Sequence, residues 1–379
     1  MSTIRPPATI GIIGGGQLGK MLSQAAKRLG YRTIILDPAA ACPAAGVCDE
    51  HLVARFDDPI ALAAMGSAAD VITYEFENVA SAPLLQLAKE TAVYPDPRIL
   101  HTLCHRTREK TALRKLGVKT ADFIPIDDPS QLAGAVDQLG LPAILKVSEG
   151  GYDGKGQQLL SCKSDLASVS LAAHHTLEAY ISFSKEISVI CARNIEGEIS
   201  SFPVTENIHR NYILYMSIAP ARLPEETAQR AVEIAEQVVE GLAGVGAFGI
   251  EMFLQPDGEI LVNEIAPRVH NSGHYTIEAC HLSQFEQHIR AICGLPPGDN
   301  RLHRPAVMVN ILGEGKRPAA RLAGIPDLMR IPEVNLHLYG KEEVRPGRKM
   351  GHLTALADSL PLALERAGAA HRLLRWEDD

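Results

Sequence analysis

Residues 143–157, AILKVSEGGYDGKGQ, decide the fold, because a short apolar strand runs there into a glycine-rich loop. The glycines between residues 150 and 156 allow consecutive backbone N–H groups to wrap around phosphate oxygens. The loop lacks the Gly-Lys-Ser/Thr ending of a P-loop, so that fold is excluded. Lys146 lies within the strand, where a buried ammonium group is costly unless an anion meets it. A flexible hairpin with a solvated lysine is the competing interpretation.

A second glycine turn lies near the N-terminus, after the apolar run Thr9–Ile13. A helix is expected over Gln17–Leu29 and a buried strand over Thr33–Leu36, which completes a βαβ unit. Two further strands of the same sheet are expected over Ala69–Glu75 and Thr91–Tyr94. The first ~100 residues therefore predict a doubly wound α/β domain.

The N-terminal turn has the spacing Gly14-x-Gly16-x-x-Gly19, and the acidic Asp37 follows the next strand. Dinucleotide-binding folds share this spacing, because the N–H groups of a helix N-terminus hold a pyrophosphate there. NAD binding is therefore one hypothesis. A turn that needs glycine for close packing, or that holds another anion, is the alternative, and the rest of the chain favours it.

The middle of the chain is expected to be α+β and mostly antiparallel. Helices are expected over Arg106–Leu116, near Lys163–His174 and over Glu225–Leu242. Strands are expected over Ala143–Val147, Gln158–Ser161, Glu178–Ile181, Glu186–Ala192, Glu198–Val204, Ala247–Leu254 and Glu259–Ile265. A proline-rich segment at Leu295–Arg304 indicates a boundary, and a small β-rich tail follows it.

Glu251 and Glu264 lie on the hairpin that turns at residues 255–258. A two-residue turn places Glu264 directly opposite Glu251, and a four-residue loop makes it a diagonal neighbour on the same face. Facing carboxylates destabilise a sheet unless a cation lies between them, and Mg²⁺ binds carboxylates together with nucleotide phosphates. Two solvated surface glutamates are the alternative. Strict alternation sends Asn263 to the other face unless a β-bulge intervenes.

Two polar segments complete the set of candidate sites. Residues 266–274, APRVHNSGH, bring together Arg, Asn, Ser and two His side chains directly after the metal candidate, and substrate positioning is favoured there over a zinc site. Residues 339–352, YGKEEVRPGRKMGH, carry a cluster of cations that predicts a local anion site. An ordinary solvated basic loop is the competing interpretation of the second segment.

Composition excludes several classes of protein. The 379 residues are 46% hydrophobic and 22% charged, typical of a globular protein with two or three domains. A net charge of −8 argues against general nucleic-acid binding. The seven cysteines are scattered without a C-x-x-C motif, which indicates reduced thiols in a cytoplasmic protein. No apolar stretch of ~18 residues is present, so no membrane span is expected.

Five motifs taken together carry a family resemblance. In chain order they are GIIGGGQLGKM, TYEFENV, GGYDGKGQ, NEIAPRVHNSGHYT and RPGRKMGH. In this combination the chain resembles the N5-carboxyaminoimidazole ribonucleotide synthetases, ATP-grasp ligases of purine synthesis, over essentially its whole length. The resemblance implies an N-terminal biotin-carboxylase-like domain (1–104), an ATP-grasp domain (105–298) with a mobile lid at about 118–182, and a small β-rich C-terminal domain (299–379). It also implies a homodimer.

The resemblance assigns roles to particular residues. It implies an ATP site made of Arg106, Lys146, Gly151, Tyr152, Asp153, Gly154, Lys155, Gly156, Gln157, Glu178, Ala179, Tyr180, Ile181, Glu186, His209, Asn263 and Glu264. It implies a ribonucleotide site made of Gln17, Leu18, Glu75, Tyr152, Asp153, Arg268, His270, Asn271, Ser272, His274, Lys341, Arg348 and Lys349. Glu251 and Glu264 match the magnesium ligands, with Mn²⁺ as an alternative, and Arg268, Lys146 and Tyr152 are expected to act in catalysis.

The implied reaction is the ATP-dependent carboxylation of 5-aminoimidazole ribonucleotide by bicarbonate, through carboxyphosphate. A sister enzyme, such as the formate-dependent glycinamide ribonucleotide transformylase or the glycinamide ribonucleotide synthetase, is the nearest rival. An NAD-dependent oxidoreductase leaves the glutamate pair and the 150–156 loop unexplained. A nucleotide-binding module without catalytic activity is a further rival. Such a module would not need both a glutamate pair for a metal ion and a separate cluster of cations.

Overall fold

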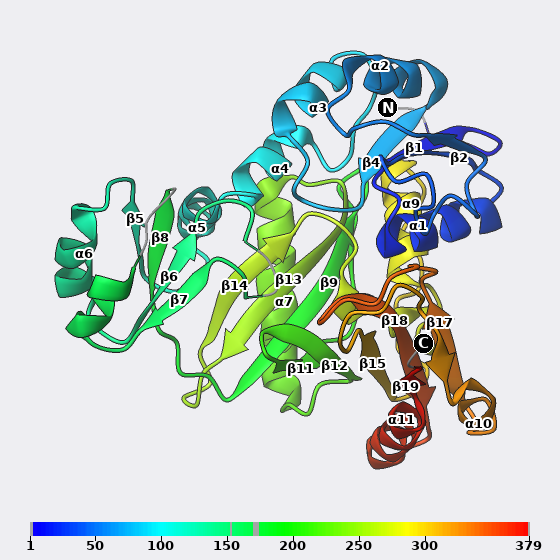
Figure 1. The fold of residues 1–379 in the computed structure, drawn as a ribbon. Helices are drawn as coiled ribbons and strands as arrows, with labels where there is room; N and C mark the ends of the chain where they lie inside the picture. The colour runs from blue at the N-terminus through cyan, green and yellow to red at the C-terminus, as the bar shows by residue number, and fades with distance from the viewer. Residues whose placement is uncertain (1–2, 152–153, 170–173, 378–379) are drawn as a thin grey trace.

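The computed structural model describes residues 3–151, 154–169 and 174–377. Tyr152 and Asp153, which were predicted to bind ATP and the ribonucleotide, lie outside these residues, and so does the catalytic role expected of Tyr152. The N-terminal part of the structure is a parallel sheet in the order β3-β2-β1-β4 (Figure 1). The strands are β1 (Thr9–Ile13), β2 (Arg32–Leu36), β3 (Glu50–Leu52) and β4 (Val71–Tyr74). The helices around it are α1 (Gln17–Arg28), α2 (Pro59–Ala68) and α3 (Ser81–Leu87). The expected doubly wound domain is confirmed.

One expected strand of this sheet is not formed. Thr91–Tyr94 makes only an isolated bridge between Val93 and Ile72. Pro95, which has no backbone N–H group, follows directly and cannot continue the ladder. The short edge strand β3 was not expected, because its residues Glu-His-Leu form no apolar run.

A four-stranded antiparallel sheet lies on the other side of the molecule and carries the glycine-rich loop (Figure 1). Its order is β5-β8-β6-β7, from β5 (Phe123–Ile126), β6 (Ala143–Val147), β7 (Gln157–Leu160) and β8 (His175–Ala179). Helix α6 (Gln131–Leu139) covers one face, and α4 (Pro97–Leu103) and α5 (Arg106–Lys115) connect this sheet to the N-terminal domain.

Two predictions in this region are wrong in their extent. The described part of the helix expected near Lys163–His174 is a short 3₁₀ helix over Lys163–Ser168, and residues 170–173 lie outside the described chain. The Asp165 carboxylate accepts hydrogen bonds from the N–H groups of Ser161 and Cys162 and holds this tight turn. The strand expected over Glu178–Ile181 starts earlier and ends at Ala179.

The central sheet is the largest in the described part of the chain. Its order is β14-β13-β9-β11-β12-β15-β18-β17, with β10 paired to β9. The strands are β9 (Lys185–Arg193), β10 (Ile199–Ser201), β11 (Thr205–Arg210), β12 (Ile213–Ala219), β13 (Gly246–Leu254), β14 (Ile260–Ala266), β15 (Ala306–Leu312), β17 (Val334–Leu338) and β18 (Lys349–Leu356). Helix α7 (Glu225–Leu242) packs on β9 and helix α9 (Gln284–Ile292) on β13 and β9.

The C-terminal strands extend the central sheet rather than forming a sheet of their own, because β15 pairs with both β12 and β18. The tail is also less β-rich than expected, since it contains α11 (Leu360–Leu373). Its buried face is made of Ala363, Ala367 and Ala370, too small to give a strong apolar pattern. The remaining short elements are α8 (Thr276–Ala279), α10 (Ile325–Leu328), β16 (Leu322–Ala323) and β19 (Arg375–Trp376).

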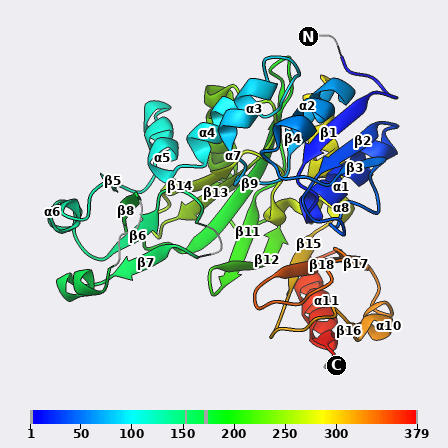
Figure 2. The same ribbon diagram turned by 45° about the horizontal axis from the view of Figure 1, so that its top comes forward.

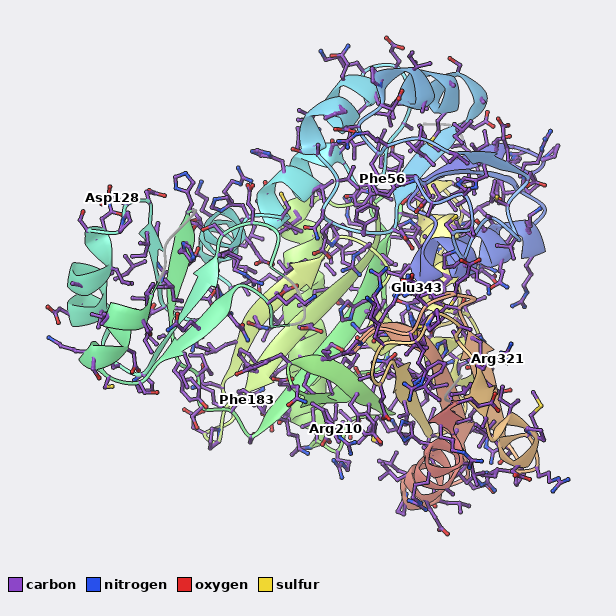
Figure 3. All side chains as sticks on the ribbon, viewed as in Figure 1. Phe56, Asp128, Phe183, Arg210, Arg321 and Glu343 are labelled. Atoms are coloured by element: carbon purple, nitrogen blue, oxygen red, sulfur yellow. The ribbon has the colours of Figure 1, made fainter. Side chains whose placement is uncertain are left out.

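The N-terminal domain is fixed to the central part by an apolar cluster between α1 and α9. Leu18 and Leu22 of α1 share this cluster with Phe285 and Ile289 of α9. In two views 45° apart, the N-terminal and C-terminal parts lie on one side and the four-stranded sheet on the other (Figure 2). The cationic loop that carries Glu343 lies near the junction of the N-terminal and C-terminal parts (Figure 3).

Close packing of the N-terminal glycine turn yields a first prediction. A Cβ atom on Gly19 would lie 2.3 Å from the carbonyl oxygen of Gly14, a backbone atom that cannot rotate away. We expect Gly19→Ala to lower the free energy of unfolding by about 1–3 kcal/mol, an amount typical of overpacking. Calorimetry should show this loss as a lower melting temperature. The matched control is Gly134→Ala inside α6, where nothing lies within 4 Å. It should stabilise the protein by about 0.5–1 kcal/mol; equal effects would contradict the packing argument.

Candidate active site

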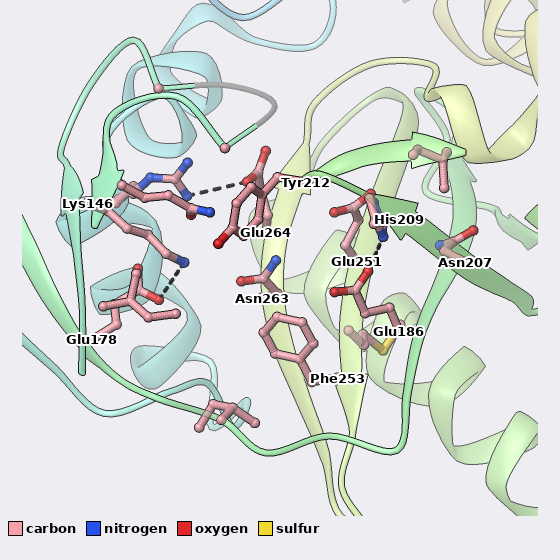
Figure 4. A pocket seen from close by; sticks show the side chains of 18 of the residues that line it. Lys146, Glu178, Glu186, Asn207, His209, Tyr212, Glu251, Phe253, Asn263 and Glu264 are labelled. Atoms are coloured by element: carbon pink, nitrogen blue, oxygen red, sulfur yellow. Dashed lines mark hydrogen bonds and ion pairs between the residues drawn. The ribbon is translucent and has the colours of Figure 1, made fainter. Parts of the chain in front are cut away.

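A cavity of about 770 Å³ lies between the four-stranded sheet and the central sheet (Figure 4). Most of the predicted site residues line it: Arg106, Lys146, Gly151, Gly154, Gln157, Glu178, Ala179, Tyr180, Ile181, Glu186, His209, Glu251, Asn263, Glu264, Arg268, His270, Asn271 and Lys349. The predicted residues that do not line it are Gln17, Leu18, Glu75, Lys155, Gly156, Ser272, His274, Lys341 and Arg348. The cavity thus joins the nucleotide candidates to part of the ribonucleotide candidates.

The mid-strand lysine meets an anion of the protein itself. The ammonium group of Lys146 donates a hydrogen bond of 2.9 Å to Oε2 of Glu178, and Lys110 lies 3.2 Å from the same oxygen. Burial opposes ionisation of Glu178, but Lys110 and Lys146 overcome it and lower its pKa to about 2. The Glu178 side chain therefore belongs to a buried ion group, and its backbone is the part left to contact a nucleotide.

The two candidate metal ligands face each other across β13 and β14. Glu251 pairs directly with Glu264, and burial followed by the Glu264 charge raises the pKa of Glu251 to about 7. Burial also opposes ionisation of Glu264, but Arg106, Lys146 and Arg268 lower its pKa. Arg106 contacts Glu264 at 3.4 Å. The carboxylate pair thus lies on the central sheet, and Arg106 and Lys146, from α5 and β6, line the same cavity.

A β-bulge places Asn263 beside these carboxylates. Met252 pairs with Val262 and Glu251 with Glu264, so Asn263 is the additional residue on β14. Because of the bulge, Asn263 and Glu264 both line the cavity although they are adjacent in sequence. Near the turn, Leu254 pairs with Ile260, a register that neither expected turn produces, and the bulge restores the direct opposition of the two glutamates.

Glu186 and His209 come from neighbouring strands and form an ion pair (Figure 4). Burial opposes protonation of His209, but the hydrogen bond that its ring donates to Glu186 outweighs burial and raises the pKa of His209. His209 lines the cavity together with Asn207, because alternate residues of β11 point to the same face. The pair forms a polar end wall next to Glu251.

Arg268 is held by a carboxylate that the sequence reasoning did not single out. Its guanidinium lies 2.6 Å from Glu77, and a second nitrogen donates to the carbonyl oxygen of Val269 at 3.0 Å. Burial raises the pKa of Glu77, and Arg268 opposes that shift. The acidic motif TYEFENV contained this residue, but its pairing depends on a contact between distant segments.

His270 has a defined tautomer. The N–H group of Ser272 donates to its Nδ1 at 3.3 Å, so the ring proton is on Nε2, which lies 3.4 Å from Glu251. The Ser272 side chain is fully buried and bonded to Ser188. His274 is also buried, and its ring centroid lies 4.8 Å from that of His352. Ser272 and His274 therefore support the loop from behind the cavity wall.

The N-terminal glycine turn holds the chain's own carboxylates. The N–H groups of Gly16 and Gly19 each donate to Glu75 at 2.6 Å, and Gly15 donates to Asp37 at 2.8 Å. Amides that would hold a pyrophosphate are therefore occupied, and the NAD hypothesis is wrong. Glu75 is fully engaged as the cap of α1.

Only one residue of the cationic cluster, Lys349, lines the cavity. Lys341 donates to the carbonyl oxygen of Lys349 at 2.7 Å, and Arg348 donates to that of Glu343 at 2.9 Å. These bonds shape the loop and leave Lys349 directed at the site.

Several lining residues escaped the sequence reasoning. Phe183 and Phe253 stack with ring centroids 4.7 Å apart. Asn207 comes from β11, a strand that was not expected, and Tyr212 from the turn between β11 and β12. Single apolar side chains carry no motif, so only the fold could place them. Among the described residues no group of three or more His, Cys, Asp or Glu side chains suits a metal ion. No helix in the described part is long and apolar enough to cross a bilayer.

Three family profiles match the chain in succession. They are the ribonucleotide synthetase preATP-grasp domain at residues 7–103, the ATP-grasp domain at 111–285 and the phosphoribosylaminoimidazole carboxylase C-terminal domain at 306–366. Together with the glycine-rich loop and the cavity between two sheets, they define an ATP-grasp ligase.

Similarity to named proteins shows which family of ATP-grasp ligases the chain belongs to. The N5-carboxyaminoimidazole ribonucleotide synthase of Brucella melitensis biotype 1 is 45% identical over 360 residues, 94% of this chain and 98% of that protein. That of Bacillus subtilis is 44% identical over 355 residues, 93% and 92% of the two chains. The chain belongs to the N5-carboxyaminoimidazole ribonucleotide synthase family.

Solved structures of similar proteins agree with this family assignment. An ADP complex of an N5-carboxyaminoimidazole ribonucleotide synthetase superposes with a TM-score of 0.92 at 45% identity, covering 98% of each chain. The synthase of Aspergillus clavatus, in complex with ADP and 5-aminoimidazole ribonucleotide, superposes with a TM-score of 0.90 at 33% identity, covering 97% of this chain and 98% of that one.

The buried ion group yields a second prediction. Glu178→Gln leaves the Lys110 and Lys146 ammonium groups facing each other with exposed side-chain fractions of 1% and 9%. Breaking such a group should cost about 3–5 kcal/mol, measured as the free energy of unfolding. The double variant Glu178→Gln/Lys110→Met removes the repulsion and should be more stable than Glu178→Gln alone. A double variant of equal or lower stability would show that the lysine charges do not oppose each other.

Proposed function

We propose that this protein carboxylates 5-aminoimidazole ribonucleotide with bicarbonate and ATP, yielding N5-carboxyaminoimidazole ribonucleotide, ADP and phosphate in purine biosynthesis. The observation that carries the proposal is the single cavity that joins the glycine-rich loop, the Glu251–Glu264 pair, the Arg268–Asn271 segment and Lys349. A phosphoryl donor, a cation and an anionic acceptor can meet there. The near full-length similarity to named synthases supports the assignment.

In this proposal the nucleotide lies between the two sheets. The backbone of Ala179–Ile181 would hold the base beside Phe183 and Phe253, and Glu186 with His209 would meet the ribose. Arg106, Lys146 and the N–H groups of the glycine-rich loop would hold the phosphates, because their charges and dipoles converge on one end of the cavity. Lys155 and Gly156 act, in this proposal, by shaping the loop.

The residues present suit Mg²⁺, with Mn²⁺ as an alternative. Glu251, Asn263 and Glu264 offer two carboxylates and a side-chain amide to a cation, and burial together with the facing Glu264 charge raises the pKa of Glu251 to about 7. When bound, the ion neutralises charge on the transferring phosphoryl group. A site of two carboxylates leaves room for phosphate oxygens as further ligands.

The chain's own groups account for the remaining steps. Arg268, oriented by Glu77, would hold bicarbonate as it attacks the γ-phosphorus and would retain the carboxyphosphate formed. Lys146 and Arg106 would stabilise the charge that develops on the transferring oxygens. The exocyclic amine of the ribonucleotide then takes the carboxyl group near His270 and Asn271, while Lys349 meets its phosphate. A homodimer, the cytoplasmic location and the domain limits 1–104, 105–298 and 299–379 remain predictions.

The test compares two reactions of the purified protein. Phosphate release should require 5-aminoimidazole ribonucleotide with bicarbonate, and it should be absent with glycinamide ribonucleotide and formate. Activity only with the second pair would replace the proposal with the transformylase reaction.

The metal assignment gives a third prediction. Glu264→Gln should lower Mg²⁺-dependent ATP turnover by at least about tenfold, because an anionic ligand to the ion and the phosphate alignment are both lost. The matched control is Glu259→Gln, an exposed carboxylate that pairs with Lys119 near the start of β14. A folded Glu264→Gln protein with unchanged magnesium dependence would exclude the glutamate as a ligand.

The phosphate assignment gives a fourth prediction. Lys349→Ala should raise the KM for 5-aminoimidazole ribonucleotide by an amount equivalent to ~1.5–3 kcal/mol, the contribution of charged hydrogen bonds, while the KM for ATP changes little. Lys316→Ala, an exposed cation of the same C-terminal part, is the control. A change confined to the ATP KM would assign Lys349 to the nucleotide instead.

A further inference from the structure

The turn between β11 and β12 holds two residues in a backbone conformation that most side chains disfavour. Arg210 pairs with Ile213, so Asn211 and Tyr212 form a two-residue hairpin turn. Their φ angles are 49° and 65°, in the left-handed region that a type I′ turn requires. Asparagine tolerates this region, and glycine is the favoured second residue. A tyrosine at that position is an outlier.

Burial does not compensate Tyr212 for this conformation. The residue is 67% exposed, so it lacks most of the stabilisation that a buried aromatic ring provides. Folding alone therefore does not explain an aromatic side chain here. A strained residue at the wall of a binding cavity is a candidate for a role in function.

Tyr212 contacts the glycine-rich loop from the opposite side of the cavity (Figure 4). A Cβ atom built on Gly154 would lie 2.5 Å from Cβ and 2.7 Å from Cγ of Tyr212. The two segments are therefore in direct contact, and only a glycine allows it. Gly154 belongs to the loop of the four-stranded sheet, whereas Tyr212 extends from the central sheet, so the contact bridges the cavity.

The same hairpin tip reaches the cationic loop. A Cβ atom on Gly347 would lie 2.6 Å from Cδ1 of Ile213, and Lys349 follows two residues later at the cavity wall. The tip thus lies between the loop proposed for the ATP phosphates and the loop proposed for the ribonucleotide phosphate. A group at this place can exclude water from the space between the two substrates.

We propose that Tyr212 is a positioning residue that holds the glycine-rich loop against the central sheet and excludes water from the reacting phosphoryl group. The proposal rests on the proposed function, because its effect falls on carboxyphosphate. In an open site, water adds to the phosphorus of carboxyphosphate and the bond from phosphorus to the bicarbonate oxygen breaks. The products are bicarbonate and dihydrogen phosphate, so ATP is consumed without carboxylation.

The experiment measures the ratio of ADP formed to carboxylated ribonucleotide formed. The ratio should be near one in the unmodified protein and in Tyr212→Phe, which keeps the ring. It should rise at least about twofold in Tyr212→Gly, which removes the ring and suits the type I′ turn. The melting temperature of Tyr212→Gly should be unchanged or higher, so unfolding does not explain the loss.

A matched control separates the ring from the backbone exchange. Ala243, at the end of α7 and away from the cavity, also has a positive φ of 50°, so Ala243→Gly relieves the same kind of backbone strain. It should leave the ratio near one. Hydrogen exchange of the amides at 154–157, measured with ADP and Mg²⁺ bound, should be at least about threefold faster in Tyr212→Gly than in the control.

The outcomes distinguish the inference from the proposed function. If the unmodified protein forms no carboxylated product, the proposed function fails, and the exchange measurement still decides whether Tyr212 holds the loop. If carboxylation occurs and the Tyr212→Gly ratio stays near one, the sealing role is overturned, whatever the rate. Unchanged exchange at 154–157 overturns the contact itself.

Discussion

One additional residue in a strand determines the chemistry of the cavity. Without the bulge at Asn263, strict alternation would turn either Asn263 or Glu264 away from Glu251. The bulge places all three on one face, and the register near the hairpin turn adjusts to allow it. The same strand is anchored from outside the sheet, since the buried Glu109 accepts a hydrogen bond of 2.7 Å from the N–H group of Ile265. The carboxylate pair is therefore fixed by backbone pairing rather than by the side chains themselves.

Charge is arranged around this pair before any substrate binds. Lys110 and Lys146 share Glu178, Glu77 orients Arg268, and Glu186 pairs with His209. Each of these cationic side chains thus has a carboxylate partner. Such pairs hold the cations in place, so little reorganisation is needed when phosphate charge arrives. The cost is a set of buried charges whose removal one at a time leaves an uncompensated partner.

The sequence predicted the local elements whose patterns are strong. Helix α7 is found at the expected Glu225–Leu242, and the 246–266 hairpin follows closely. Thr91–Tyr94 failed as a strand because Pro95 ends the pairing, and α11 was missed because its buried face is alanine. Strands β11 and β12 were missed although both are central, and with them Tyr212 and Asn207. A polar strand that borders a cavity, such as Thr205–Arg210, shows no apolar alternation to detect.

The two glycine motifs, at residues 14–19 and 150–156, differ in how well they predict a binding site for an external anion. Both glycine turns predicted close approach of a backbone to an anion, and the structure shows such an approach at the N-terminal turn. At the N-terminal turn the anions are Glu75, which lies 59 residues from Gly16 in the sequence, and Asp37, which lies 22 residues from Gly15. Glycine spacing therefore reports the geometry of exposed N–H groups and says nothing of whether the chain itself supplies the carboxylate. The loop at residues 150–156 instead faces a cavity that Lys146 and Arg106 also line. The cations beside a glycine loop, rather than the glycines, identify it as a site for an external phosphate.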